Sequence, residues 1–350
     1  MNREICIGNR SIGGRNPLFV VAEISANHAQ KFDRAVELIN KAKECGADAV
    51  KFQTYTPDTL TLDIDSKYFQ IEHPEWGGRT LYSLYQKAHT PWKWFKKLKE
   101  TADNVGIVFF STAFDRTSVD FLEGIGVPVH KISSFELVDL PLIEYAAKTG
   151  KPLILSTGMA TIAEIREAVN AARKAGAKEV ILLKCASSYP AVPEDMNLKT
   201  ILHMKEFFKS HVGLSDHTLG IETSIAAVSL GAVMVEKHFT LSRKFKTPDS
   251  FFSIEPGELK QLVKSVRIAE RALGKIQYGP VENEKKSMAF RKSLFAAEDI
   301  EKGEVFTDSN IRAVRPANGL KPKCLKTILG KKARKKIRKG IPLDRTHVGK

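Results

Sequence analysis

The strongest constraint on the fold is a regular alternation of short apolar runs with longer amphipathic stretches. The apolar, β-branched runs cover residues 19–25, 49–55, 107–113, 129–134, 153–157, 180–185, 212–215 and 233–239. Stretches between them, such as 32–45, 162–175 and 256–273, space their apolar residues with a helical period. Apolar strands that alternate with helices predict an α/β fold with a parallel sheet covered by helices. Eight such strands within about 250 residues predict a closed (β/α)8 TIM barrel. No G-x-G-x-x-G turn follows the first strand, which disfavours a dinucleotide-binding sheet.

The alternation stops at about residue 274. We therefore predict a barrel domain over residues 1–274, a polar linker over 275–290, and a small β-rich domain over 291–350 with strands near 294–296 and 311–314. A domain of about 60 residues has a small core and is expected to lean on a partner surface. The segment 56–90 is long for a connection between a strand and a helix, which indicates a role at the active site.

The composition is typical of a soluble globular protein, with 43% hydrophobic and 27% charged residues. The apolar stretch 17–24 is far shorter than the roughly 20 residues that span a bilayer, and no signal-type apolar region follows the first residues. Four cysteines without a C-x-x-C pair are typical of a reducing compartment. We expect a cytoplasmic protein with no membrane partner.

The net charge of +15 is concentrated near the end of the chain. Residues 321–350 carry twelve Lys or Arg and one Asp, a local charge of +11, whereas the first 320 residues carry only +4. Such a stretch is compatible with nucleic-acid or other polyanion binding. The run 331–339 has no interleaved aromatic residues, and it is followed by the apolar residues of 340–343. We therefore favour a solvated face of a folded domain and expect no nucleic-acid partner.

Polar residues stand at the predicted carboxyl ends of the strands, where the active site of such a barrel lies. Lysines recur on the second, fourth, sixth and eighth strands as Lys51, Lys131, Lys184 and Lys237, with Ser or Thr hydroxyls beside them. Polar groups inside apolar runs are costly unless they are paired, so this recurrence indicates a binding site. Its chemistry suits an anion that carries phosphate and carboxylate groups. The alternative for each lysine is a structural ion pair, an interpretation that is equally acceptable for Lys184 and Lys237.

Two histidines and two glutamates add possible catalytic groups. His217 and His238 end adjacent predicted strands, where two imidazoles can share a divalent cation with water and substrate oxygens. Two histidines do not choose between manganese, zinc and iron, and each alone would be compatible with a hydrogen-bonded core residue. Glu23 and Glu136 are candidates for a general acid or base, with a salt bridge to a lysine as the alternative. No G-x-S-x-G or Walker motif supports acyl transfer or nucleotide hydrolysis.

Several of these segments resemble the sialic acid synthase family. They are residues 22–28 (AEISANH), 46–53 (GADAVKFQ), 156–159 (STGM), 213–218 (GLSDHT) and 236–240 (EKHFT). Members of this family condense phosphoenolpyruvate with a six-carbon amino sugar to make a nonulosonate. Segments 89–98 and 131–143 are most similar to the pseudaminic acid branch, and 291–350, with RPANG at 315–319, resembles the family's antifreeze-like (SAF) domain.

The resemblance implies a role for each matched residue. The positions that would hold phosphoenolpyruvate are Lys51, Thr112, Lys131, Ser134, Ser156, Ser187 and Ser215. The positions that would face the acceptor sugar are Glu23, Gln53, Glu136, Tyr189, Asp249 and Arg315. His217 and His238 match the ligands of a divalent cation, Mn2+ or Mg2+. Ser187 departs from the sialic acid synthase pattern, in which an amide is usual.

The branch implies 2,4-diacetamido-2,4,6-trideoxy-L-altrose as the acceptor. The long 56–90 segment also departs from the sialic acid synthase pattern, which argues against N-acetylmannosamine. The family further implies a domain-swapped homodimer in which Arg315 completes the neighbour's site. The alternatives are an N-acetylneuraminate synthase that uses N-acetylmannosamine, and a polyanion-binding protein that uses residues 321–350. A purely structural role is the least favoured, because it does not require polar strand ends.

Overall fold

The computed structural model describes residues 4–73 and 75–349, and the chain divides into two compact units, one ending at Gly274 and the other beginning at Lys275. We describe each unit by itself. Among the described residues, no helix combines the length and the apolar character needed to cross a membrane.

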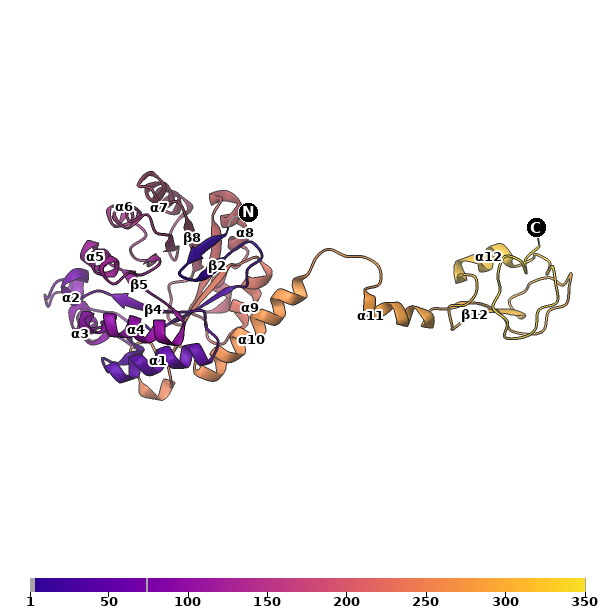
Figure 1. Ribbon diagram of the computed structural model, residues 1–350, viewed down its shortest axis with the longest axis horizontal. Helices are drawn as coiled ribbons and strands as arrows, with labels where there is room; N and C mark the ends of the chain where they lie inside the picture. The colour runs from indigo at the N-terminus through magenta and orange to yellow at the C-terminus, as the bar shows by residue number, and fades with distance from the viewer. Residues whose placement is uncertain (1–3, 74, 350) are drawn as a thin grey trace. The chain divides into compact units, whose positions relative to one another are not determined.

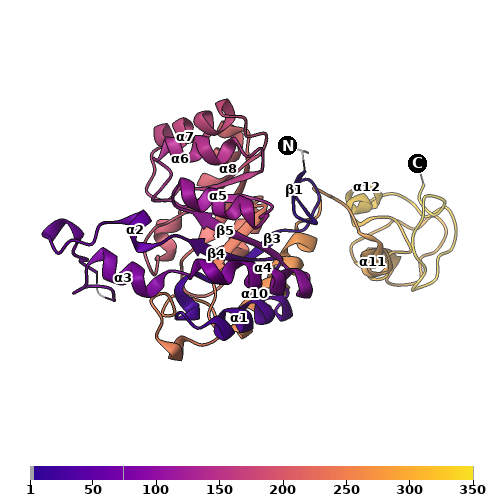
Figure 2. The same cartoon turned by 60° about the vertical axis from the view of Figure 1, so that its left-hand side comes forward.

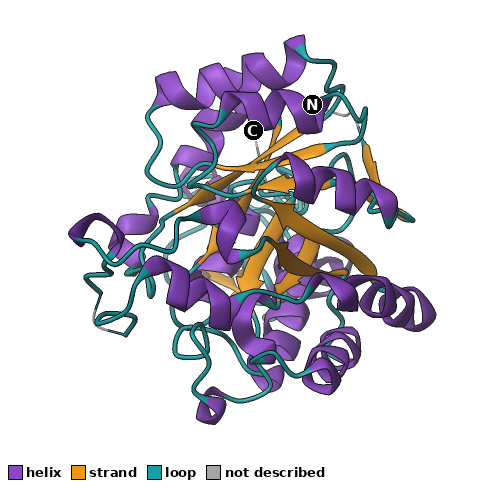
Figure 3. Ribbon diagram, turned by 90° about the vertical axis from the view of Figure 1, so that its left-hand side faces the viewer, coloured by secondary structure: helices purple, strands orange, loops and turns teal. Residues whose placement is uncertain are grey.

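The first unit is a closed barrel of eight parallel strands, as predicted from the alternation of apolar runs. The strands are β3 (Phe19–Glu23), β4 (Ala49–Thr54), β5 (Val108–Ala113), β6 (His130–Ile132), β7 (Leu153–Ser156), β8 (Val180–Cys185), β9 (His211–Asp216) and β10 (Met234–His238). They pair in sequence order, and β10 closes the barrel against β3. The surrounding helices are α1 (Phe32–Glu44), α4 (Phe95–Val105), α5 (Arg116–Gly124), α6 (Leu140–Ala147), α7 (Ile162–Lys174), α8 (Thr200–Phe208), α9 (Glu222–Ser229) and α10 (Pro256–Leu273) (Figures 1 and 3).

The helix α7 shows how the sequence determines these elements. Thr161 is its N-cap and accepts a hydrogen bond from the backbone of Glu164, whose side chain bonds back to the Thr161 backbone. This capping box satisfies two backbone groups that the first helical turn leaves free. The buried residues Ile165, Ala168 and Ala172 recur at helical spacing and pack in the main apolar core between helices and strands.

Alternation along the strands separates two apolar layers. In β3, Val20 and Ala22 belong to the core shared with the helices, whereas Phe19 and Val21 belong to a separate cluster inside the barrel. Tight packing of the barrel wall explains Gly213 in β9, because a Cβ atom there would lie 2.5 Å from the carbonyl oxygen of Met234.

A hairpin that the sequence analysis did not identify packs against this inner cluster. The antiparallel strands β1 (Ile5–Ile7) and β2 (Arg10–Ile12) contribute Ile5, Ile7 and Ile12 to the cluster that contains Phe19 and Phe110. Apolar side chains therefore fill the barrel interior at the amino-terminal ends of the strands.

The second unit has a small core of its own. Its strands β11 (Ser293–Ala296) and β12 (Ile311–Val314) pair in antiparallel fashion, which confirms a small β-rich unit. Leu294, Phe306 and Leu343 are among the side chains that fill this core. The unit also contains the short helices α11 (Glu282–Lys285) and α12 (Leu325–Ile328). The predicted linker 275–290 thus includes α11, and its Ala289 carbonyl accepts a hydrogen bond from the backbone of Ala317.

Candidate active site

The carboxyl ends of the barrel strands surround a small cavity of about 50 Å³, which we call the floor cavity. Strand register brings its polar residues to similar levels, since Glu23 lies opposite both Lys51 and His238 on the two neighbouring strands. The predicted site residues on its wall are Glu23, Lys51, Gln53, Thr112, Lys131, Ser134, Ser156, Tyr189, Ser215, His217 and His238. Residues that are more than 200 positions apart in the sequence therefore meet at one place.

Lys51 is buried in the floor cavity between two carboxylates. Its Nζ lies 2.7 Å from Oε2 of Glu23 and 3.5 Å from Oε1 of Glu236, and it donates to Thr112 Oγ1 at 2.8 Å. Burial opposes the charge of Lys51, but the two carboxylates outweigh it and raise the pKa of the lysine. Lys51 therefore carries a positive charge at neutral pH.

Lys131 has different surroundings. Its side chain is 2% exposed, and its Nζ donates to Ser156 Oγ at 2.7 Å and to the Ile132 carbonyl at 3.1 Å. Within the described part of the chain, no carboxylate lies at ion-pair distance from it. Burial lowers the pKa of Lys131, and Glu236 partly offsets this effect. A buried ammonium without a close counter-ion is stabilised by an anionic ligand.

Serine hydroxyls surround a glycine beside these lysines. The backbone N–H of Gly158 donates to Ser134 Oγ at 3.0 Å. A Cβ atom at Gly158 would overlap Ser187 Oγ and lie 2.8 Å from Ser134 Oγ, so any larger residue would displace both hydroxyls. Ser187 itself is not on the wall of the floor cavity, and its Oγ lies 3.9 Å from the Sγ atom of Cys185.

The two predicted metal ligands are buried side by side. The ring centroids of His217 and His238 are 5.3 Å apart. His217 Nδ1 lies 2.8 Å from the Ala186 carbonyl, which favours an N–H at that nitrogen and leaves Nε2 to bind a cation. Burial lowers the pKa of His217, but Cys185, the Ala186 carbonyl and Glu236 outweigh it and raise that pKa, so a cation at Nε2 would displace a proton. His238 Nδ1 is buried without a hydrogen-bond partner among the described residues, 3.8 Å from Asp249 Oδ2. Burial, followed by the nearby His217, lowers the pKa of His238 well below its usual value, so its imidazole is neutral.

The two histidines fit a divalent cation that takes only some of its ligands from the protein. Two adjacent imidazoles, one with an unpartnered buried nitrogen, are suitable ligands for such an ion. In the ranges 4–73 and 75–349, no group of three or more His, Cys, Asp or Glu side chains is arranged to hold a metal. The remaining ligands would therefore have to be substrate or water oxygens.

The pKa values of the two carboxyl groups beside Lys51 are shifted in opposite directions. Burial raises the pKa of Glu23 to about 7, although Lys51 opposes the shift. Burial acts in the same direction on Glu236, but Lys51 and Lys131 outweigh it and lower the pKa of that carboxyl. Two neighbouring carboxyls with separated pKa values are an arrangement that suits acid–base chemistry.

A larger cavity of about 380 Å³ adjoins the floor cavity, and we call it the acceptor cavity. Gln53, Tyr189 and His238 lie on the walls of both cavities. The predicted residues Glu136 and Asp249 lie on the wall of the acceptor cavity. Burial is the largest influence on both, and it raises the pKa of Glu136 and that of Asp249.

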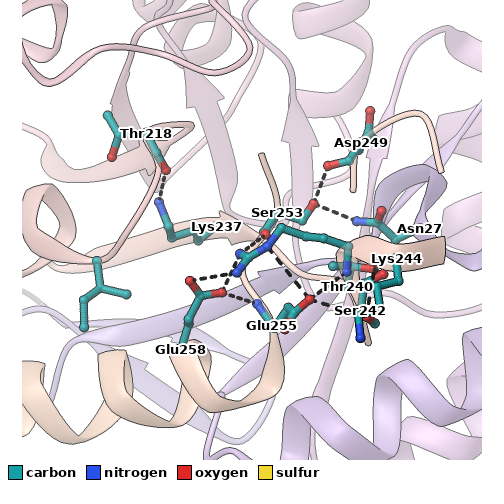
Figure 4. A network of polar contacts seen from close by, with 12 residues as sticks. Asn27, Thr218, Lys237, Thr240, Ser242, Lys244, Asp249, Ser253, Glu255 and Glu258 are labelled. Atoms are coloured by element: carbon teal, nitrogen blue, oxygen red, sulfur yellow. Dashed lines mark hydrogen bonds and ion pairs between the residues drawn. The ribbon is translucent and has the colours of Figure 1, made fainter. Parts of the chain in front are cut away.

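Asp249 is positioned by a network around the loop that follows β10 (Figure 4). Its backbone carbonyl accepts a hydrogen bond from Ser253 Oγ at 2.6 Å, and Asn27 Nδ2 donates to the same serine at 2.9 Å. Its carboxylate accepts from the backbone N–H of Ala26 at 3.3 Å. These bonds connect the end of β3 to the loop after β10, and they fix the edge of the acceptor cavity.

The long segment 56–90 forms much of the wall of the acceptor cavity, as its length indicated. It contains the helices α2 (Pro57–Leu60) and α3 (Leu81–Ala88), which lie side by side at the edge of the barrel (Figures 1 and 2). The segment contributes the side chains of Leu60, Ile71, Trp76, Leu81, Leu84, Tyr85 and Ala88. Sequence reasoning identified the segment but none of these residues.

Two of the four strand lysines lie outside the cavities: Lys237 makes the structural ion pair that the sequence left open, whereas Lys184 bonds to a backbone carbonyl. Lys237 Nζ lies 3.0 Å from Asp216 Oδ2 and donates to the Thr218 carbonyl at 2.7 Å, a bond that Figure 4 shows. Lys184 Nζ donates to the Cys185 carbonyl, and neither lysine is on the wall of either cavity. On each strand, the lysine is next in sequence to a residue whose side chain faces into the barrel. Because successive side chains of a strand point to opposite faces, the lysine side chain points out of the barrel.

Other residues were missed or lie elsewhere. Glu236 and Cys185 are on the floor cavity wall. Glu236 could have been found from strand period, because it stands two positions before His238. Burial raises the pKa of the Cys185 thiol, but His217, whose Nδ1 lies 3.7 Å from Sγ, and the hydroxyls of Ser134 and Ser187 together outweigh it and lower the pKa to about 7. Arg315 is exposed on the second unit, directly after β12.

The closed barrel, with a cavity lined by buried lysine side chains at the carboxyl ends of its strands, defines a (β/α)8-barrel enzyme. Comparison with known families adds a match of residues 38–278 to the NeuB family and of residues 291–348 to the SAF domain. The chain belongs to the NeuB family.

Individual relatives agree with this assignment. The chain is 44% identical to pseudaminic acid synthase of Campylobacter jejuni over 326 residues, which cover 93% of this chain and 95% of that protein. It is also 44% identical to pseudaminic acid synthase of Helicobacter pylori over 330 residues, covering 94% and 97% of the two chains. Among solved structures, a sialic acid synthetase from Leptospira borgpetersenii in complex with citrate is 35% identical with a TM-score of 0.74, over 82% of this chain and 96% of that one.

Proposed function

We propose that this protein condenses phosphoenolpyruvate with 2,4-diacetamido-2,4,6-trideoxy-L-altrose to form pseudaminic acid and inorganic phosphate. The observation that carries the proposal is the pair of adjoining cavities. One is small and lined by two buried lysines and several hydroxyls, and the other is large enough for a sugar. The choice of acceptor is supported by the names of the 44% identical relatives.

Lys51 and Lys131 would hold the phosphate and carboxylate groups of phosphoenolpyruvate, together with the hydroxyls of Thr112, Ser134, Ser156 and Ser215. Charged donors in a buried site stabilise the negative charge that develops on these groups during the reaction. The family resemblance adds Ser187 to this set, and its hydroxyl lies next to Gly158, close to Ser134 Oγ.

In the first step, C3 of phosphoenolpyruvate attacks the aldehyde carbon of the open-chain sugar and forms the new C–C bond. Glu23, partly protonated at neutral pH, donates its proton to the aldehyde oxygen, which becomes a hydroxyl. Water then adds at C2 and returns one proton to the Glu23 carboxylate. The C2–O bond to phosphate breaks as the new C2 hydroxyl becomes a keto group, and the proton of that hydroxyl leaves with inorganic phosphate. Glu136, Gln53, Tyr189 and Asp249 would orient the hydroxyl and amide groups of the sugar.

His217 and His238 are the residues that would hold a divalent cation, Mn2+ or Mg2+. When bound, such an ion supplies Lewis acidity toward the aldehyde oxygen or a water molecule. The neutral imidazole of His238 and the Nδ1 bond of His217 to the Ala186 carbonyl hold both rings in a form suited to this task.

The second candidate is an N-acetylneuraminate synthase that uses N-acetylmannosamine. The 35% identical sialic acid synthetase structure and the 36% identical human N-acetylneuraminate-9-phosphate synthase favour it. The two candidates are separated by measuring phosphate release from phosphoenolpyruvate with each sugar at equal concentration. We expect a higher kcat/KM with the diacetamido sugar, and faster release with N-acetylmannosamine would overturn the choice.

Assembly as a domain-swapped homodimer is part of the same proposal. Arg315 is exposed on the second unit and matches a family position at the acceptor sugar, so it would complete the site of a neighbouring barrel. The test mixes two inactive variants, Arg315→Ala and His217→Ala, under conditions that exchange subunits. Activity should return, because one site in each mixed dimer then combines an intact barrel with an intact arginine. No recovery after proven exchange would refute the swap.

A cytoplasmic location also belongs to this proposal. All four cysteines are free, including the buried Cys45 and Cys185. Free thiols are typical of a reducing compartment, in which phosphoenolpyruvate is also available.

A further inference from the structure

The acceptor cavity has two chemically different sides. Its side toward the barrel carries polar groups, among them those of Gln53, Glu136 and Asp249. Its other side comes from the segment 56–90 and is formed largely by apolar side chains, including Leu60, Ile71 and Trp76. This division indicates a ligand that is polar at one end and apolar at the other.

The apolar side is held in place by hydrogen bonds within the segment 56–90 and to the loop after β10. The backbone of Ile71 donates to the Arg79 carbonyl at 3.0 Å, within a short antiparallel bridge of the segment. Trp76 Nε1 donates to the Pro248 carbonyl at 2.9 Å, and its ring lies 5.8 Å from that of Tyr189, measured between centroids. The apolar wall is therefore anchored beside Asp249, at the edge of the acceptor cavity.

We infer that Leu60, Ile71 and Trp76 select the acceptor sugar by its methyl groups, the C6 methyl of a 6-deoxy sugar and the methyls of its acetamido groups. The inference rests on the proposed function and adds the residues that set its specificity. The sugar hydroxyls and the aldehyde would face the polar side, next to the floor cavity, and the methyl groups would face the segment 56–90.

The physical basis is the cost of an unpaired hydroxyl. A sugar with a hydroxyl on C6 would place that group against carbon atoms, where it loses its hydrogen bonds to water. An apolar pocket rejects an analogue that adds one hydroxyl by up to about 100-fold. We expect kcat/KM for the 6-deoxy sugar to exceed that for its 6-hydroxy counterpart by about 10- to 100-fold.

The test compares 2,4-diacetamido-2,4,6-trideoxy-L-altrose with its 6-hydroxy counterpart in four variants of the full-length protein. Leu60→Asn and Ile71→Asn place an amide on the wall of the acceptor cavity. Leu62→Asn and Ile64→Asn make the same changes at positions of the segment that are 58% and 46% exposed and are not on that wall. Phosphate release gives kcat/KM for each sugar, and the KM for phosphoenolpyruvate reports on the floor cavity.

The two wall variants should lower the ratio of kcat/KM between the deoxy and hydroxy sugars by about 10-fold or more. The KM for phosphoenolpyruvate should stay unchanged, and the two exposed controls should keep the wild-type ratio. A merely structural role would reduce activity with both sugars equally, and an unchanged ratio would overturn the inference. A wild-type ratio near one would also overturn it. Activity with neither sugar, but with N-acetylmannosamine, would instead refute the proposed function on which it rests.

Discussion

The floor cavity and the wall of the acceptor cavity are built in opposite ways. The floor uses charged residues on barrel strands, and Lys51 and Lys131 are only 3% and 2% exposed. The wall uses apolar residues on a long segment whose neighbouring positions Leu62 and Tyr68 are 58% and 79% exposed. Strands of a closed barrel position charges precisely, whereas a long loop can change its side chains without disturbing the barrel. In the proposed function, the rigid part of the molecule would carry out the reaction, and the adaptable part would choose the acceptor.

The largest expected effect lies on the floor side. If His217 helps to hold a cation there, His217→Ala should reduce phosphate release to the detection limit with little change in the urea midpoint of unfolding. Chelation of the wild type should have the same effect, and it should be reversed by added Mn2+ or Mg2+. The exposed His203 offers a control, because His203→Ala should keep full activity. Unchanged phosphate release in the presence of the chelator would show that the reaction needs no metal in the floor cavity.

A loss of about 10²- to 10³-fold in kcat/KM for phosphoenolpyruvate is expected for Lys131→Met, because a buried charge that stabilises the developing anion is removed. Lys184→Met is the matched control, since Lys184 is on the wall of neither cavity. Steady-state kinetics with varied phosphoenolpyruvate measures both. An equal loss in the two variants would mean that the floor does not bind the anion.

Sequence period accounts for what could be predicted. Alternation along the strands and helical spacing between them predicted the barrel, and the strand ends predicted the cluster that contains Lys51, Lys131 and His217. Within the end of β10, the same two-residue period separates the inward Glu236 and His238 from Lys237, which pairs with Asp216.

Site residues on loops could not be predicted from the periodicity of the sequence. Leu60, Ile71 and Trp76 reach the acceptor cavity through irregular backbone, which leaves no period in the sequence. The β1–β2 hairpin was missed because its two strands have only three residues each. Ser187 was placed among the phosphate ligands by resemblance alone and is not on the wall of the floor cavity, so its role stays a prediction.

The free energy of unfolding should also distinguish Lys131, which would bind substrate, from the structural lysine Lys237. Lys237→Met removes one partner of a buried ion pair and leaves Asp216 uncompensated, which should lower the free energy of unfolding by about 3–5 kcal/mol. Lys131→Met removes a buried charge that has no close counter-ion and should leave stability unchanged or raised. Urea unfolding of the isolated variants measures the difference. A larger destabilisation from Lys131→Met would make that lysine structural.

The smallest expected effect concerns pH. Glu23 has a pKa of about 7 in the free protein and acts as an acid only when it is protonated, so kcat/KM should fall as pH rises through about 7, approaching tenfold per unit above it. Glu23→Gln should remove this slope together with most of the activity, while Glu136→Gln should keep the slope at reduced activity. A slope that persists in Glu23→Gln would assign the proton to another group.

The proposed function requires that the floor cavity hold phosphoenolpyruvate while an acceptor sugar in the acceptor cavity is joined to its C3 atom. The most direct measurement is the mass of the product formed when the protein is given phosphoenolpyruvate, 2,4-diacetamido-2,4,6-trideoxy-L-altrose and N-acetylmannosamine together, at equal sugar concentrations. We expect a product whose mass is that of phosphoenolpyruvate plus the diacetamido sugar plus water, less phosphoric acid. One phosphate should be released for each molecule of product. A product built mainly from N-acetylmannosamine, or phosphate released without a new C–C bond, would contradict it.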